Sequence, residues 1–182
     1  PLAASRVCCS SARFRKPKIC RLTTTGDTAV GAALEKDDPA GLEFCALRYS
    51  EIAQAAFEAG FFDVWTTARQ AEATTNYELG STHADAAALR RSITRLEALA
   101  AQETALGGKE IASLLRLLGH AHAELGQLTQ DTGALKCAIS AYEASTKHAE
   151  GRDQGTITRL TEQNIQLCRD AISSLQPTSR SD

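Results

Sequence analysis

Beyond Pro39 the apolar residues recur at helical spacing, and glycines interrupt them at intervals of about one helix length. The glycines stand at positions 60, 80, 107, 108, 126 and 151. Glycine is common just past the end of a helix, where the chain takes a left-handed conformation. Apolar residues three and four positions apart predict amphipathic helices, and no stretch alternates as a strand would. This part of the chain is therefore predicted to be all-α.

The spacing predicts six helices. They lie near residues 39–59, 61–79, 82–106, 109–125, 131–150 and 155–175. Asp38 and Asp131 are expected to cap helix starts, and Thr82 with Asp85 to form a capping box. Short links between helices imply antiparallel neighbours. We expect stacked antiparallel helical hairpins, as a short solenoid or a bundle, with an extended N-terminal arm.

The charge of the chain is unevenly distributed. The 182 residues carry 20 basic and 22 acidic side chains. Six of the basic ones, and no acidic one, lie in residues 1–26, so the rest has a net charge of −8. The six are Arg6, Arg13, Arg15, Lys16, Lys18 and Arg21. The predicted organisation is a basic arm and linker over 1–38, a helical domain over 39–176 and a tail over 177–182.

The arm has three interpretations. Its Ser, Thr, Ala and Arg content and its lack of acids are typical of an organellar transit peptide or its remnant. Residues 7–10, Val-Cys-Cys-Ser, resemble a plastid processing site, so an organellar location is predicted, with plastid preferred over mitochondrion. The alternatives are a retained arm that binds an acidic partner or RNA, and an unstructured tail. The chain contains no Met, and we expect that it lacks its original start.

One segment carries a family resemblance. The pattern Leu-x-x-Leu-Gly-x-x-His, followed by Ala-x-x-x-Tyr, resembles a tetratricopeptide repeat over about residues 115–150. Its positions are Leu115, Leu118, Gly119, His122, Ala138 and Tyr142. The resemblance implies that Gly119 and Ala138 let two helices approach closely, while Leu118 and Tyr142 fill grooves between hairpins.

The segment departs from the family pattern in two ways. Leucine and histidine replace the usual Trp and Tyr, and 19 positions separate Gly119 from Ala138, about seven more than in the 34-residue repeat. We expect the helix near 39–59 to pair with that near 61–79, and 109–125 with 131–150. The helix near 82–106 is then left unpaired, and the last helix caps the stack.

No pattern in the chain predicts catalysis, a metal site or a cofactor. The run Gly107-Gly108-Lys109 lacks the other residues of a phosphate-binding loop. His120 and His122 are two positions apart on a helix, so they point in different directions and do not suit one metal ion. We expect His122 to pack between helices and His120 to be exposed. No catalytic, metal or cofactor residue is proposed, and the chain is expected not to be an enzyme.

Other polar groups are expected to have ordinary roles. The acids Glu51, Glu58, Glu72, Glu97, Glu124 and Glu143 are expected on solvated helix faces. Arg90, Arg91 and Arg95 form a basic stripe, expected to pair with glutamates. The thiols of Cys45, Cys137 and Cys168 are expected to be buried and reduced. No apolar run is long enough to predict a membrane span.

These features favour a non-catalytic protein–protein interaction scaffold, most simply an accessory structural subunit of a larger organellar multiprotein complex. The partners are then other protein subunits, with an acidic or RNA contact through the arm. Phe61, Phe62, Trp65 and Tyr49 are candidates for an exposed aromatic patch, with core packing as the alternative. Two other functions stay open: an RNA-associated organellar, ribosomal subunit that uses the arm, and a tetratricopeptide-type assembly factor or adaptor.

Overall fold

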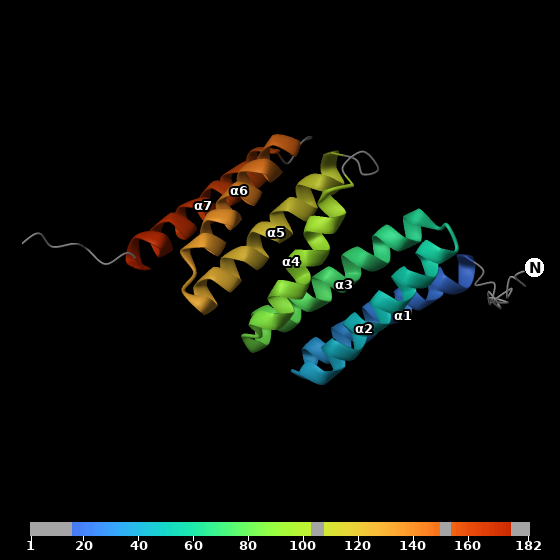
Figure 1. Ribbon diagram of the computed structural model, residues 1–182. Coiled ribbons are helices and arrows are strands. Elements are labelled where there is room, and N and C mark those ends of the chain that lie inside the picture. Colours follow the sequence, from blue (N-terminus) through green and yellow to red (C-terminus); the bar gives the residue numbers. More distant parts are fainter. Residues whose placement is uncertain (1–15, 103–107, 150–153, 176–182) are drawn as a thin grey trace, which may run out of the picture.

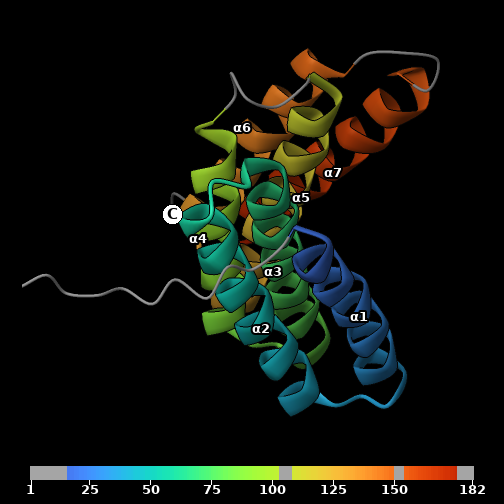
Figure 2. The ribbon, with the colours of Figure 1, turned by 90° about the vertical axis from the view of Figure 1, so that its right-hand side faces the viewer.

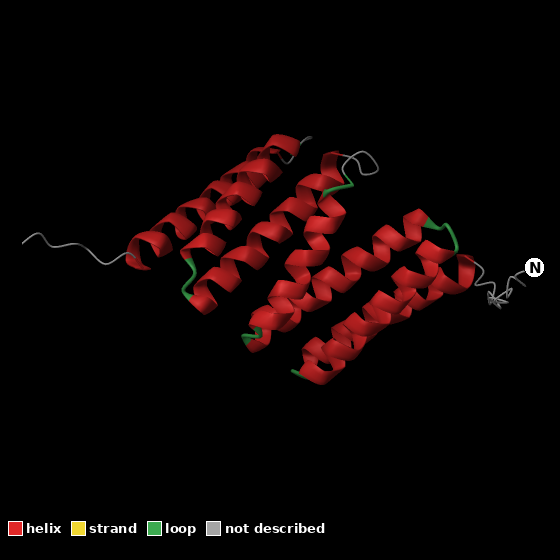
Figure 3. Cartoon of the chain, in the orientation of Figure 1, coloured by secondary structure: helices red, strands yellow, loops and turns green. Residues whose placement is uncertain are grey.

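The computed structural model describes residues 16–102, 108–149 and 154–175. Within these ranges the chain forms seven α-helices and no strand (Figure 1, Figure 3). The helices are α1 Lys16–Glu35, α2 Pro39–Glu58, α3 Phe62–His83, α4 Ala86–Ala100, α5 Gly108–Thr129, α6 Thr132–His148 and α7 Gln154–Leu175. The prediction of an all-α chain of packed antiparallel helices is confirmed.

The helices stack in chain order. Each helix packs against the next one along the chain, and α1, α3, α5 and α7 also contact one another in sequence. The stack therefore has two layers, and Figure 2 places α2, α4 and α6 to the left of α1, α5 and α7. The core lies between these layers, where apolar helix faces meet.

The turns α1–α2, α3–α4 and α5–α6 have the same construction. In each, one residue is left-handed, with φ of 53°, 53° and 55°: Asp37, Ala84 and Gln130. The next residue is an aspartate that caps the following helix: Asp38, Asp85 and Asp131. Its backbone N–H donates, at 2.9–3.1 Å, to a carbonyl in the last turn of the preceding helix. The α3–α4 and α5–α6 turns consist of the left-handed residue and the cap alone, while the α1–α2 turn also contains Lys36.

These three hairpins are structural repeats. Asp85 lies 47 residues after Asp38, and Asp131 lies 46 residues after Asp85. Four positions after each aspartate a leucine is fully buried: Leu42, Leu89 and Leu135. The prediction that α4 is unpaired is wrong, because α4 packs against both α3 and α5. The expected pairings of α2 with α3 and of α5 with α6 are confirmed, and the repeated turns join two further pairs, α1 with α2 and α3 with α4.

Glycine has a different role from the one predicted. Gly80 and Gly126 lie inside the last turns of α3 and α5, not beyond them. A Cβ on Gly80 would lie 2.5 Å from Cγ of Leu89, and one on Gly126 would lie 2.7 Å from Cγ of Leu135. These glycines let the two helices of a hairpin approach closely. Among the described glycines, Gly60 alone takes a left-handed φ, at 74°.

Residues 22–38 are not the predicted linker. Most of them belong to α1, whose Ala33 is buried and whose Val30 packs against the cores on both sides of α2. The threonines and glycines of this segment lower its helix propensity, but burial of an apolar face outweighs propensity. The boundary predicted at residue 38 therefore does not separate an arm from the helical domain.

The start of α4 also differs from expectation. Asp85 caps it alone, because its Oδ1 accepts from the backbone N–H groups of Ala87 and Ala88 at 2.8 and 3.1 Å. Thr82 belongs to α3, where its hydroxyl donates to the carbonyl of Glu78 at 2.6 Å. The predicted capping box is therefore wrong, since the two residues lie on opposite sides of a left-handed turn.

The last helix occupies the place that a fourth hairpin would give its first helix. α7 contacts α5 as α5 contacts α3, and it also packs along α6. Its buried Ile165 and Cys168 pack against Tyr142. They lie 47 residues after Leu118 and Ala121, which are buried at matching positions of α5. Over the described ranges, no helix is long and apolar enough to cross a membrane.

Candidate protein interaction surfaces

An aromatic corner, defined here as Phe57, Phe61, Phe62 and Trp65, surrounds the turn between α2 and α3. Phe57 and Phe62 are 54% and 62% exposed, while Phe61 and Trp65 are half-buried. The ring of Phe57 meets that of Phe62 edge-on at 6.1 Å and that of Trp65 at 6.2 Å. Phe57 thus contacts two further aromatic rings at the surface, and together they form an apolar patch of the kind that interfaces use.

The sequence identified this corner only in part. It named Phe61, Phe62 and Trp65 but not Phe57. On α2 the neighbouring Ala56 is buried, whereas Phe57 is exposed. Tyr49, the fourth candidate, is 1% exposed and belongs to the core.

Tyr49 is fixed between α1 and α2. Its hydroxyl donates to Oδ1 of Asp27, and its ring lies where a Cβ on Gly26 would be. Burial first, and the hydrogen bond to Asp27 second, raise the pKa of the Tyr49 hydroxyl. This tyrosine therefore holds α1 to α2 and does not face a partner.

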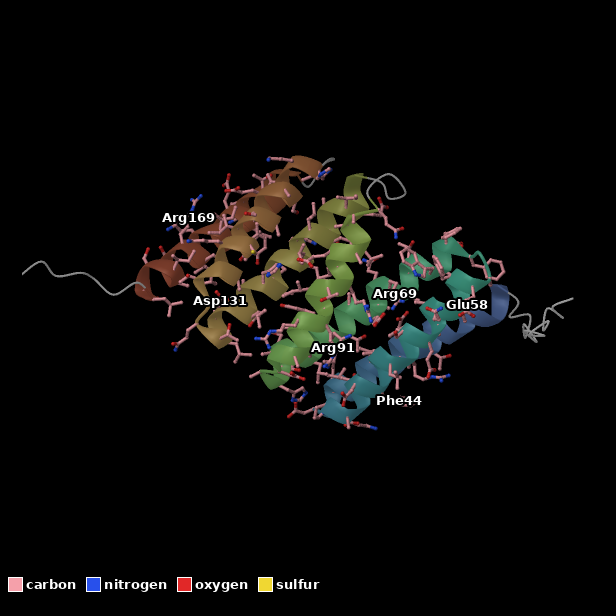
Figure 4. All side chains as sticks on the ribbon, viewed as in Figure 1. Phe44, Glu58, Arg69, Arg91, Asp131 and Arg169 are labelled. Atoms are coloured by element: carbon pink, nitrogen blue, oxygen red, sulfur yellow. The ribbon has the colours of Figure 1, made fainter. Side chains whose placement is uncertain are left out.

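A second surface is a groove between α2 and α4, with α3 as its floor. The groove has a volume of about 560 Å³. Its walls and floor include Glu43, Phe44, Ala46, Leu47 and Ser50 of α2, Glu72 and Asn76 of α3, and Arg91 and Arg95 of α4. Figure 4 shows Arg69 and Arg91 near the line where α3 and α4 face α2, and Phe44 on α2.

A buried carboxylate organises the floor of this groove. Glu72 is 4% exposed. Its Oε2 accepts from Nη1 of Arg69 at 2.7 Å, and its Oε1 accepts from Nε of Arg95 at 2.9 Å. The expectation that Glu72 lies on a solvated face is wrong. Arg69 and Arg95 approach it from its own helix and from α4, and a charge can be buried only when it is paired in this way.

The amide of Asn76 extends the network. Its Nδ2 donates to the backbone carbonyl of Glu72, and its Oδ1 accepts from Nε of Arg91, both at 2.9 Å. The expected pairing of the basic stripe with glutamate therefore holds for Arg95, whereas Arg91 is bound to an amide. Nη2 of Arg91 lies 3.9 Å from Oδ2 of Asp85.

The equivalent positions of the next hairpin carry no such network. Forty-six residues after the positions of Glu72, Asn76, Arg91 and Arg95 stand Leu118, His122, Cys137 and Ala141. Leu118 is buried in the core with residues of α4. The repeat therefore places an apolar side chain where Glu72 lies, so the fold does not require the charged network.

The predicted repeat positions pack as hairpin contacts. A Cβ on Gly119 would lie 2.6 Å from the ring of Tyr142, and Ala138 is fully buried. Leu118 packs toward α4, while Tyr142 packs toward Ile165 and Cys168 of α7. Leu115 is half-buried beside the same cluster as Leu118. Leu118 and Tyr142 thus fill the spaces on the two sides of the third hairpin.

The two histidines of α5 are both half-buried. Nδ1 of His120 lies 2.9 Å from the Tyr142 hydroxyl, so the expectation of an exposed His120 is wrong. Nε2 of His122 lies 3.8 Å from Oε1 of Glu97. Burial lowers the pKa of both histidines, with nearby Arg116 adding to the effect at His120 and Glu97 opposing it at His122. Burial also raises the pKa of the Tyr142 hydroxyl.

The thiols divide into two groups. Cys45 and Cys168 are buried, and burial raises the pKa of both. Cys137 is exposed, against expectation. In the part of the chain that the structure describes, no three His, Cys, Asp or Glu side chains gather as a metal-binding group.

Part of the basic arm lies outside the residues that the structure describes. Arg6, Arg13 and Arg15 fall outside the described residues, while the backbones of Lys16, Lys18 and Arg21 form the start of α1. Figure 1 shows that this start lies at the same end of the stack as the turn between α2 and α3. The arm therefore joins the helical stack at the end that carries the aromatic corner.

Comparison with known protein families, with curated proteins and with solved structures finds no match to this chain. Arguments about function therefore depend on the two surfaces themselves.

Proposed function

We propose that this chain is a non-catalytic protein–protein interaction scaffold of tetratricopeptide-like hairpins, an accessory structural subunit of a larger organellar complex. The observation that carries this proposal is the aromatic corner. Burying one large apolar side chain contributes roughly 1.5–3 kcal/mol. Phe57 and Phe62 leave more than half of their surface in water, so a partner that covers the corner gains this energy.

The partner docks as a neighbouring protein subunit with an apolar face. Aromatic side chains dominate the centres of such interfaces because they bury a large area at a small entropic cost. The start of α1 supports this geometry, because it brings the basic arm to the same end of the stack. The arm then contacts acidic surface on the same partner, and its composition supports an organelle, with plastid preferred.

The test compares native mass in a gentle organellar extract. We expect the wild-type chain to migrate in a large complex, also after RNase treatment, with its partner subunits identified by proteomics. The variant Phe57→Ser/Phe62→Ser should migrate outside that complex. The matched control is Leu167→Ser, which removes an equally exposed apolar side chain, 61% exposed, from α7 at the other end of the stack.

Migration of the wild type near its own mass of 19.4 kDa would contradict the subunit function. Loss of the complex on RNase treatment would favour the RNA-associated alternative. If Leu167→Ser abolishes assembly and the phenylalanine variant does not, the partner docks on α7 and the corner is not the interface.

A further inference from the structure

The charged groove between α2 and α4 is a surface distinct from the aromatic corner. We propose that this groove binds an acidic segment of a partner protein. Arg91 and Arg95 hold a carboxylate of that segment, and an adjacent apolar side chain lies against Phe44 and Leu47. The inference rests on the proposed function only in that the ligand is a protein, and it uses no residue of the corner.

The first argument is the position of Glu72. In the next hairpin the equivalent residue is Leu118, and in α7 it is Ile165, both buried. Burying a carboxylate costs desolvation free energy, so a buried ion pair is weak evidence that the carboxylate stabilises the fold. The stack repeats without it one hairpin later, so its presence in this groove points to a role in holding Arg69 and Arg95 in place.

The second argument is the geometry of the two arginines on α4. Nε of Arg91 is bound to Asn76 and Nε of Arg95 to Glu72. Both acceptor residues are buried, so each guanidinium is fixed by its inner edge. The side chains are nevertheless 45% and 41% exposed, and both line the groove. Guanidinium groups arranged in advance bind a carboxylate with two parallel hydrogen bonds at a small entropic cost.

The third argument is the local charge. Two cations, Arg91 and Arg95, line the inner wall with one buried carboxylate, Glu72, and a third cation, Arg69, binds that carboxylate from outside the lining. Asp85 approaches Arg91 only to 3.9 Å. Glu43 lies on the opposite wall and is exposed. The wall formed by α3 and α4 therefore has an excess of positive charge, although the helical domain as a whole is acidic, and it complements an acidic ligand.

The fourth argument is the apolar wall on α2. Phe44 and Leu47 are 63% and 58% exposed, and both line the groove. They are three positions apart, so they lie on one face of the helix. A volume of about 560 Å³ is within the range of sites that bind small ligands and accommodates a few side chains. The ligand therefore combines at least one carboxylate with a neighbouring apolar side chain.

The experiment is a selection from a displayed library of fully randomised heptapeptides on the purified chain. Each enriched peptide is then made with a fluorescent label and titrated against the variants. We expect the enriched peptides to contain Asp or Glu next to Leu, Ile or Phe. Their affinity should fall about 10- to 100-fold in Glu72→Leu/Arg95→Ala, because a charged hydrogen-bond pair is lost. Phe44→Ser should weaken binding to a smaller extent.

The double variant is chosen to fold, because it reproduces Leu118 and Ala141 of the next hairpin, and Arg69 keeps the hydroxyl of Ser50 as an acceptor at 3.4 Å. Its helical circular dichroism should match that of the wild type. Arg169→Ala serves as the control for charge, since it removes an exposed arginine of α7, and it should bind as the wild type does.

Three results would overturn the proposal: no enrichment of any peptide, enriched peptides without an acidic residue, or equal binding to the wild type and to the folded double variant. None of these results would contradict the proposed role of the aromatic corner. Phe57→Ser/Phe62→Ser should bind the labelled peptides normally, so failure of the groove and failure of the scaffold function are separate outcomes.

Discussion

Gly119 lies against the ring of Tyr142 so closely that a Cβ on the glycine would be 2.6 Å from Cδ1 and Cε1. The first hairpin has the same relationship, because a Cβ on Gly26 would lie 2.7 Å from Cζ of Tyr49. In the second hairpin the equivalent residues are Ala73 and Leu96, both fully buried. Each hairpin therefore matches the size of one residue to that of the residue facing it.

This relationship predicts that Gly119→Ala destabilises the fold by about 1–3 kcal/mol, the usual cost of an overpacked core. Tyr142→Leu alone also destabilises, since it leaves a cavity and removes the contact with His120. The double variant recreates the pair of the second hairpin, and it should be less destabilised than the sum of the two changes. Urea unfolding of the four proteins measures this coupling.

Gly31→Ala is the control, because no atom outside the local backbone lies within 4 Å of a Cβ there. The substitution should stabilise α1 by up to about 1 kcal/mol, the difference in helix propensity. Strict additivity of the two changes at Gly119 and Tyr142 would show that the glycine does not serve the tyrosine.

Ala84 offers a test of the repeated turn. It takes a left-handed φ of 53° without a polar side chain that could stabilise that conformation. Ala84→Gly should therefore raise the free energy of unfolding, by about 1 kcal/mol, because glycine adopts this φ freely. Ala87→Gly, in the first turn of α4, should lower it. A loss of stability in Ala84→Gly, measured by urea unfolding, would contradict the left-handed turn.

The sequence predicted the helices that follow Pro39, and most of their first and last residues. Each of these helices has a wide apolar face, and most begin at a residue that favours a helix start. The sequence could not predict α1 equally well. Only Val30 and Ala33 give that helix a described apolar contact, and its threonines and glycines argue against a helix. Missing α1 left the α1–α2 hairpin out of the prediction, which hid the repeat.

One signal in the sequence would have revealed the repeat. Asp-x-x-x-Leu occurs at Asp38, Asp85 and Asp131 with nearly equal spacing. Aligning the hairpins on these aspartates places Glu72 in register with Leu118 and so marks it as buried. The exposure of Phe57, in contrast, depends on which side chains pack around it in three dimensions, and local spacing contains no information about that.

The buried network predicts a specific stability pattern. Arg95→Ala removes one of the two partners of Glu72, and it should cost about 1–3 kcal/mol because the carboxylate stays buried. Adding Arg69→Leu and Glu72→Leu removes the rest of the charged cluster and reproduces Leu115 and Leu118 of the next hairpin, so it should recover most of that loss. Replacing buried ion pairs by apolar groups is often neutral or stabilising. Urea midpoints of the single and triple variants measure the recovery. A triple variant less stable than Arg95→Ala would show that the network is a structural requirement of the fold.

The two histidines of α5 predict how stability depends on pH. Burial lowers the pKa of both below the value of about 6.5 expected in the unfolded chain. His120 faces Tyr142 of α6 and Tyr77 of α3, with Arg116 on its own helix, and His122 faces Glu97 of α4. Below pH 6.5 the unfolded chain therefore binds protons that the folded chain does not.

The direction of the pH effect on stability follows from this difference in proton binding between the folded and the unfolded chain. The contribution of these histidines to stability is complete above pH 6.5 and is lost as the pH falls from 6.5 toward their lower folded pKa values. The free energy of unfolding should decrease between pH 7.5 and 5.5. In His120→Gln/His122→Asn the decrease should be smaller, and the second change copies Asn76 of the preceding hairpin. An equal decrease in both proteins, measured by urea unfolding at the two pH values, would assign the pH dependence to other groups.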